Sequence, residues 1–101
     1  MTKRLFIREM LTNPDFFYVL AKHLDKIFPD GWTFEDSAIC AVDGTGGWDE
    51  ALKKTCAELD MKDWYYYLNS LDWQMYDILS EYISDLLCAV IFNENGQRVD
   101  C

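Results

Sequence analysis

The sequence predicts a mainly α-helical protein, a compact bundle of about five helices around a long helix near the C-terminus. The first observation is composition: half of the 101 residues are hydrophobic. This is enough apolar content for one core, in a single globular domain over residues 1–101. The second observation is spacing, because in most segments the apolar residues recur at the interval of a helix and not at that of a strand.

Two helices are expected before the central region. Residues 3–11 form a short amphipathic helix with a basic face, whose cations we expect to pair with acidic groups of the same chain. Asn13 followed by Pro14 is a helix start signal, so the second helix covers residues 14–28. His23 lies on its apolar face, where we expect a packed side chain and not a catalyst.

Residues 33–42 allow two interpretations. Thr33-Phe34-Glu35-Asp36 resembles a capping box, which would start a helix that ends near residue 42, and we favour this helix. The apolar run over residues 38–42 equally fits a short buried strand. The glycine-rich segment 43–47 that follows matches neither a phosphate-binding loop nor a calcium loop, so we expect a connector there.

Two further helices follow. The first covers residues 48–59 and has one apolar face; opposite it, acidic and basic residues are spaced four apart, as in Asp49 with Lys53, Glu50 with Lys54 and Lys54 with Glu58. The second covers residues 61–68, with Asp60 as its cap and with Trp64, Tyr65 and Leu68 pointing inward.

The long helix covers residues 70–92. Its apolar arc is too wide for a surface helix, so we expect it to be packed on several sides. Ser70 is the expected N-cap, and Asp72 lies in the first turn, where the helix dipole favours a negative charge. Its polar positions form a narrow stripe of Gln74, Asp77, Ser80, Glu81, Ser84, Asp85 and Cys88.

The C-terminal segment, residues 88–101, is open between helix and strand. Asn95-Gly96 is the strongest short signal for a β-hairpin turn, and a small C-terminal hairpin is therefore one interpretation. A helix that continues to a C-cap at Gly96 explains the same residues.

Charge is distributed unevenly along the chain. Nine basic residues accompany eighteen acidic ones, a formal net charge of −9. Residues 1–28 carry a small positive excess, so the acidity belongs to the remainder. Binding to phosphate backbones requires neutralising cations, so we expect no direct contact with nucleic acid. We expect instead a protein partner with a basic surface.

The sequence gives no sign of a cofactor, a metal site or a reaction. The four cysteines contain no CxxC pair and the chain has one histidine, so we expect no structural zinc. No secretion signal is apparent at the start, and no apolar run is long enough to cross a membrane. We therefore expect reduced thiols, a cytoplasmic location and no enzymatic activity.

Acidic residues of the long helix are the first candidate site. Asp77, Glu81 and Asp85 are four residues apart, so they would stand about 6 Å apart along one face of the helix. This is close to the spacing of successive phosphates in a nucleic-acid strand. Asp60, Asp63 and Asp72 are near in sequence and would extend the negative surface. An ordinary solvated face is the alternative.

Aromatic residues beside carboxylates are the second candidate. A short helix cannot bury all four rings of residues 64–67 on one side, so some must be exposed. An exposed Tyr66, Tyr67 or Trp73 would mark a contact surface, because large rings bury much area at low entropy cost. The alternative is that these rings fold over the N-terminal helix and belong to the core.

A short, strongly acidic, mostly helical chain with aromatics set among carboxylates resembles the small inhibitors encoded by phages and mobile elements, the anti-CRISPR proteins among them. The resemblance is one of class and rests on no defined motif. It implies a stoichiometric inhibitor in which Asp77, Glu81 and Asp85 stand in for phosphates in the nucleic-acid channel of an enzyme such as a Cas effector. The alternative function is a small helical adaptor or oligomer that uses Trp73 and Tyr67.

Overall fold

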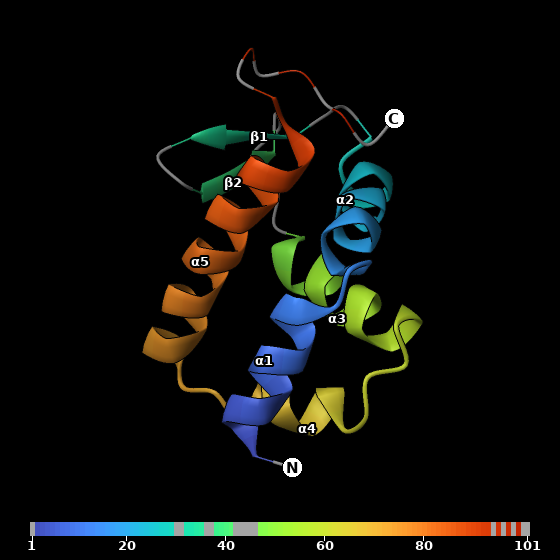
Figure 1. The fold of residues 1–101 in the computed structure, drawn as a ribbon. Helices are drawn as coiled ribbons and strands as arrows, with labels where there is room; N and C mark the ends of the chain where they lie inside the picture. Colours follow the sequence, from blue (N-terminus) through green and yellow to red (C-terminus); the bar gives the residue numbers. More distant parts are fainter. Residues whose placement is uncertain are drawn as a thin grey trace.

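The computed structural model describes residues 2–29, 32–35, 38–41, 47–93, 95, 97 and 99, with the backbone alone at 33–35 and 38–41. The elements in these ranges are α1 (Lys3–Thr12), α2 (Phe16–Ile27), β1 (Trp32–Glu35), β2 (Ala38–Ala41), α3 (Trp48–Glu58), α4 (Trp64–Asn69) and α5 (Trp73–Ile91). The predicted mainly helical fold with a long C-terminal helix is confirmed (Figure 1).

The core forms where four helices meet. The most extensive contact is between α2 and α3, and α5 packs against α2 and β2 (Figure 1). Side chains that are completely or almost completely buried come from α1, α2, α3 and α5: Phe6, Met10, Phe16, Leu20, Leu24, Leu52, Thr55, Cys56, Ile83, Leu87 and Ile91. α4 closes the end of the core near the N-terminus, where its Tyr67 ring stacks on Phe6 with 5.1 Å between centroids.

Local hydrogen bonds decide where the helices start. Thr2 Oγ1 accepts from the amide of Leu5 at 3.2 Å and caps α1. The Asn13 carboxamide oxygen accepts from the amide of Asp15 at 2.9 Å, which forms a turn, so α2 begins two residues later than expected. α5 is capped by Asp72 and not by Ser70, because the Asp72 carboxylate accepts from the amide of Met75 at 2.8 Å.

The helix favoured over residues 33–42 is wrong. β1 and β2 pair antiparallel, with Trp32 opposite Ala41 and Glu35 opposite Ala38, so the strand interpretation of the apolar run is correct. Trp32 fixes the hairpin on the helices: its Nε1 donates to Asp25 at 2.9 Å and its ring meets Phe92 edge-on. The connector expected at 43–47 lies outside the described residues except for Gly47.

The turn between α3 and α4 differs from the prediction. α4 begins at Trp64 and not at Met61, and Asp60 caps the end of α3 instead of the start of α4. The amide of Met61 donates to the carbonyl of Cys56 at 3.1 Å and that of Asp60 to Ala57 at 3.1 Å, the two bonds of a Schellman motif. Asp60 therefore occupies the left-handed position, with φ of 54°.

The chain after α5 forms hairpin-type hydrogen bonds. α5 ends at Ile91, where the amide of Val99 donates to the carbonyl of Ile91 at 2.8 Å. The amide of Asn93 donates to the carbonyl of Gln97 at 2.8 Å. These bonds across the turn favour the hairpin interpretation of the segment; Gly96 itself lies outside the described residues.

Candidate functional site on the long C-terminal helix

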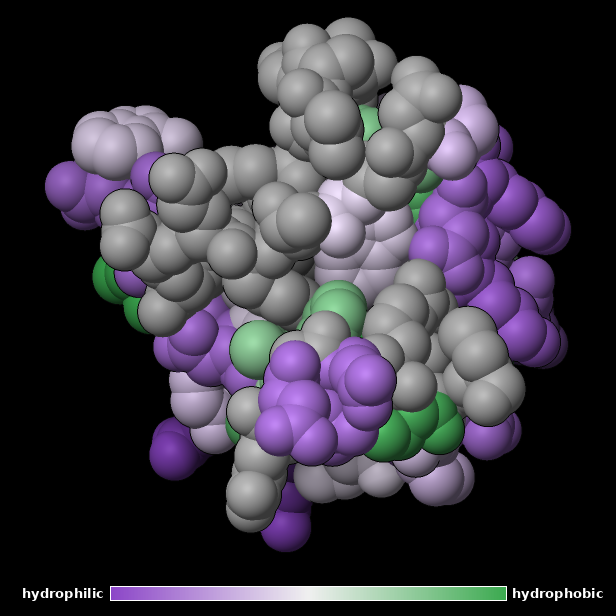
Figure 2. All heavy atoms as spheres, turned by 90° about the horizontal axis from the view of Figure 1, so that it is seen from above, coloured by the Kyte–Doolittle hydropathy of each residue, from purple (hydrophilic) through white to green (hydrophobic). Residues whose placement is uncertain are grey.

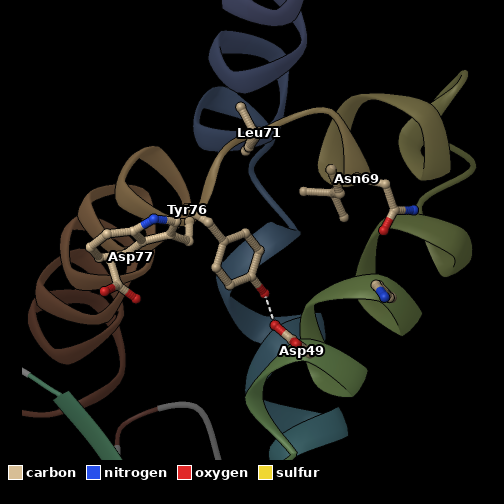
Figure 3. A pocket seen from close by; sticks show the side chains of 8 residues that line it. Asp49, Asn69, Leu71, Tyr76 and Asp77 are labelled. Carbon is tan, nitrogen blue, oxygen red and sulfur yellow. Dashed lines mark hydrogen bonds between the residues drawn. The ribbon is translucent and has the colours of Figure 1, made fainter.

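α5 is held in a fixed rotation by its apolar face and by two side-chain hydrogen bonds to α3. Leu79, Ile83 and Leu87 point into the core. Trp48 Nε1 donates to the hydroxyl of Ser80 at 2.8 Å, and the Tyr76 hydroxyl donates to the Asp49 carboxylate (Figure 3). Because these contacts fix one side of α5, they also determine which residues face solvent.

The phenol of Tyr76 stays protonated in this arrangement. Burial raises its pKa first, and the hydrogen bond to the negative Asp49 raises it further. Tyr76 therefore acts as a hydrogen-bond donor that ties α5 to the start of α3, and we assign it a positioning role.

Asp77, Glu81 and Asp85 all lie on the solvent side of α5, and we call these three residues the acidic stripe. They rise by about 6 Å per step along the helix. Across the described residues, Lys54 forms an ion pair with Glu50 at 3.0 Å and His23 Nε2 lies 3.3 Å from the Glu58 carboxylate, and neither contact involves the stripe. The three carboxylates are thus available to an external cation.

The predicted polar stripe is narrower than expected. Ser84 is buried, and its hydroxyl donates to the carbonyl of Ser80 at 2.9 Å. Ser80 accepts from Trp48, and Ser80 and Cys88 are half-buried. The two serines therefore belong to the packed side of α5, which small polar residues can join by bonding to the helix backbone.

The other acidic candidates are not brought to the stripe. Asp72 is exposed, but its carboxylate caps α5. Asp60 and Asp63 are exposed at the turn between α3 and α4, on the side of the molecule away from α5 (Figure 1). The chain reverses direction through α4, so residues that are near in sequence reach different surfaces.

The aromatic candidates divide in the same way. Trp73 is 74% exposed, and both Trp73 and Asp77 line a pocket of about 310 Å³. Figure 3 shows this pocket with Asp77 labelled. Tyr67 is only 8% exposed and stacks on Phe6 of α1, so for this ring the alternative is correct: it folds over the N-terminal helix and belongs to the core. Tyr66 is 66% exposed, and Tyr65 is also 66% exposed, so the expectation that Tyr65 points inward is wrong.

The sequence analysis missed an apolar surface beside the acidic stripe. A groove of about 350 Å³ between α1 and α5, the α1–α5 groove, is lined by Ile7, Leu11, Met75, Ile78, Leu79 and Tyr82. α5 packs on several elements, as expected, but Ile78 is 68% exposed and Tyr82 53% exposed, so part of its apolar arc faces solvent. The width of the apolar arc was the available signal, because one packing face cannot cover it.

The opposite side of the molecule is an ordinary charged surface. Lys22, Asp25 and Lys26 of α2 are exposed, and hydrophilic side chains gather on one side of the face seen in Figure 2. The packed position expected for His23 is confirmed: its side chain is 12% exposed. The surface therefore separates into a mixed-charge side and a side, on α5, where negative charge and apolar groups are adjacent.

No described group of His, Cys, Asp and Glu side chains is arranged to hold a metal ion. Cys56 is buried against the Met10 thioether at 3.8 Å, and burial raises its pKa to about 12, so it is a core thiol. Among the described helices, none has both the length and the apolarity to cross a membrane.

Comparisons of the chain with protein-family models, curated proteins and solved structures find no match.

Proposed function

We propose that this protein is a cytoplasmic, stoichiometric inhibitor that places its acidic stripe on the cationic surface of a nucleic-acid-processing enzyme such as a Cas effector. The observation that carries the proposal is the alignment of Asp77, Glu81 and Asp85, exposed and outside any described ion pair. No turnover is involved; inhibition comes from occupying the site that phosphates would occupy.

The physical basis is electrostatic complementarity. Channels for guide or target strands are lined by Lys and Arg, and a chain of net charge −9 is attracted to them over several ångströms. Two hydrogen bonds between α3 and α5, from Trp48 to Ser80 and from Tyr76 to Asp49, hold α5 in place. The helix therefore loses little conformational entropy when the protein binds its partner. Like charges four residues apart destabilise a helix slightly. Attraction of the three carboxylates to a cationic partner would offset this cost.

The test is charge reversal of the stripe in the variant Asp77→Lys, Glu81→Lys, Asp85→Lys. The partner enzyme is first captured from bacterial lysate on the immobilised wild-type protein. Binding of this enzyme to the wild-type protein and to the variant is then measured at low and high salt. We expect the variant to lose binding and inhibition while its circular dichroism stays helical, because the stripe contributes nothing to the core.

The matched control reverses three carboxylates elsewhere: Glu9→Lys, Asp15→Lys and Asp63→Lys, all exposed, outside α5 and in none of the described ion pairs. It changes the net charge by the same amount. Equal loss of binding in both variants would indicate a nonspecific effect of charge, and retained inhibition by the stripe variant would refute the proposal.

A second candidate function, a small helical adaptor, is favoured by one observation. Trp73, Tyr65 and Tyr66 are large rings with more than half of their surface exposed, and such rings are typical interface anchors. In this case Trp73→Ala would weaken capture more than charge reversal does, and the complex would persist at high salt, because apolar contacts are little screened.

A further inference from the structure

The α1–α5 groove has an apolar floor between two edges of opposite charge. Ile78, Tyr82 and Met75 supply its exposed side on α5, with 68%, 53% and 49% of their surfaces exposed. Going round α5 past Ile78, the next positions are Asp85 and Glu81 of the acidic stripe, given about 100° per residue. The α5 edge of the groove is therefore negative.

The α1 edge is positive. Ile7 and Leu11 line the groove, and the next positions round the outer side of α1 are Arg4 and Arg8, both exposed. We expected these cations to pair with acidic groups of the same chain, but in the part of the chain that the structure describes, no ion pair involves them. Lys3 donates to the carbonyl of Ser70 at 3.1 Å.

α1 and α5 run in the same direction on either side of the groove (Figure 1). A two-fold axis parallel to both helices would therefore set α1 of one copy opposite α5 of another along each edge, so that each positive edge meets a negative one. A two-fold axis perpendicular to the helices would instead oppose like charges. The charge pattern is thus complementary to itself in one orientation.

We propose that the α1–α5 groove binds a second copy of this chain, forming a symmetric dimer in which Ile78 and Tyr82 of each copy are covered and Arg8 lies opposite Glu81 of the second copy. The register supports this pair: Ile7 and Leu11 share the groove with residues 75–82, so Arg8 lies at the level of the middle of that segment. The proposal goes beyond the inhibitor function and does not depend on it, but both use Glu81, so a second copy and the inhibited enzyme compete for this side chain.

The available area sets the expected strength. The nineteen residues of α5 span about 28 Å, and two adjacent helices give a face about 20 Å wide. Such a face covers at most about 560 Å² per copy, or about 1,100 Å² in total, which is the lower end for specific interfaces. We therefore expect a dimer that forms at micromolar concentrations and dissociates on dilution.

Sedimentation equilibrium of the full chain over about 1–500 µM tests the proposal. We expect Ile78→Asp to abolish the dimer, and Tyr66→Ala, an equally exposed ring on α4, to leave it unchanged. Arg8→Glu and Glu81→Arg should each weaken it about tenfold, and the double variant should restore it. Circular dichroism checks that each variant is folded.

The charge swap separates pairing from an effect of net charge. Arg8→Glu makes the chain more acidic and Glu81→Arg makes it less acidic, so a net-charge effect would move the two dissociation constants in opposite directions. A folded chain that stays monomeric throughout, or a double variant that remains as weak as the single ones, would overturn the dimer. Neither result bears on the inhibitor function, which capture measures separately.

Discussion

At the scale of single residues, Cys56 illustrates how packing controls chemistry. Its thiol is fully buried against Met10, where a thiolate would have no contact with water. Burial raises its pKa to about 12 from the ordinary 9.0. The consequence is a cysteine that contributes packing and resists reaction, in contrast with the half-buried Cys88.

We therefore predict that folding loses stability above about pH 9. The unfolded state ionises Cys56 from pH 9.0 and the folded state only near pH 12, so the contribution is complete below pH 9 and is lost as the pH rises between these values. Its slope is at most about 1.4 kcal/mol per pH unit. Urea unfolding at pH 8 and pH 10 measures this decrease in the free energy of unfolding. The decrease should be smaller in the variant Cys56→Ala; a decrease equal to that of the wild-type protein would exclude Cys56 as the cause.

Asp60 is a second residue whose conformation has a measurable cost. It holds the left-handed position of a Schellman motif, with φ of 54°, and puts a negative charge at the C-terminal end of α3. We predict that Asp60→Gly stabilises the fold by about 1 kcal/mol, measured by chemical denaturation.

The control is the same new residue three positions earlier. Ala57 is exposed in the helical part of α3, so Ala57→Gly should destabilise by up to about 1 kcal/mol. If Asp60→Gly and Ala57→Gly change the free energy of unfolding in the same direction, the left-handed backbone of Asp60 carries no strain.

At the scale of elements, the acidic stripe favours partner binding but destabilises the helix that carries it. Asp77 and Asp85 each stand four residues from Glu81 on an exposed face, and such like-charge pairs are unfavourable. We predict that Glu81→Lys raises the free energy of unfolding by about 0.5 to 1 kcal/mol while it weakens partner capture. Glu81→Gln, which removes the like-charge contacts without adding an attraction, is the control and should give about half of this gain; a Glu81→Lys variant that loses stability would contradict the account.

The helices could be predicted from the sequence because their period is local, but two features depended on distant residues. The local sequence of residues 33–42 fits a helix with a capping box and a strand equally well. The contacts of Trp32 with Asp25 and Phe92, which hold the hairpin on the helices, come from other parts of the chain. The inward direction of Tyr67 depends on its ring stacking on Phe6 of α1, which the spacing within α4 does not show.

The candidate site was predictable in part for the same reason. Helical spacing gave the acidic stripe its common face, and all three carboxylates lie there. The groove was not predictable, because spacing shows that Ile78 and Tyr82 are on one side of α5 but not that α1 leaves them uncovered.

At the scale of the whole molecule, net charge opposes compactness. A chain of −9 repels itself, and the ion pairs in the described ranges involve at least one exposed partner and contribute little. We predict that the thermal midpoint rises between about 10 and 300 mM NaCl as screening weakens this repulsion. Scanning calorimetry measures the shift; a midpoint that falls with salt would indicate that attractive pairs dominate.

The division of α5 also limits how its sequence can change. One side of α5 fills the core, the next lines the α1–α5 groove and the third carries the acidic stripe. Most side chains in the middle of the helix therefore belong to one of these three surfaces. In a saturation mutagenesis scan, α5 should tolerate polar substitution at Gln74 and Ala89 and little elsewhere. The outer side of α2, at Lys22 and Lys26, should accept almost any residue that helices permit.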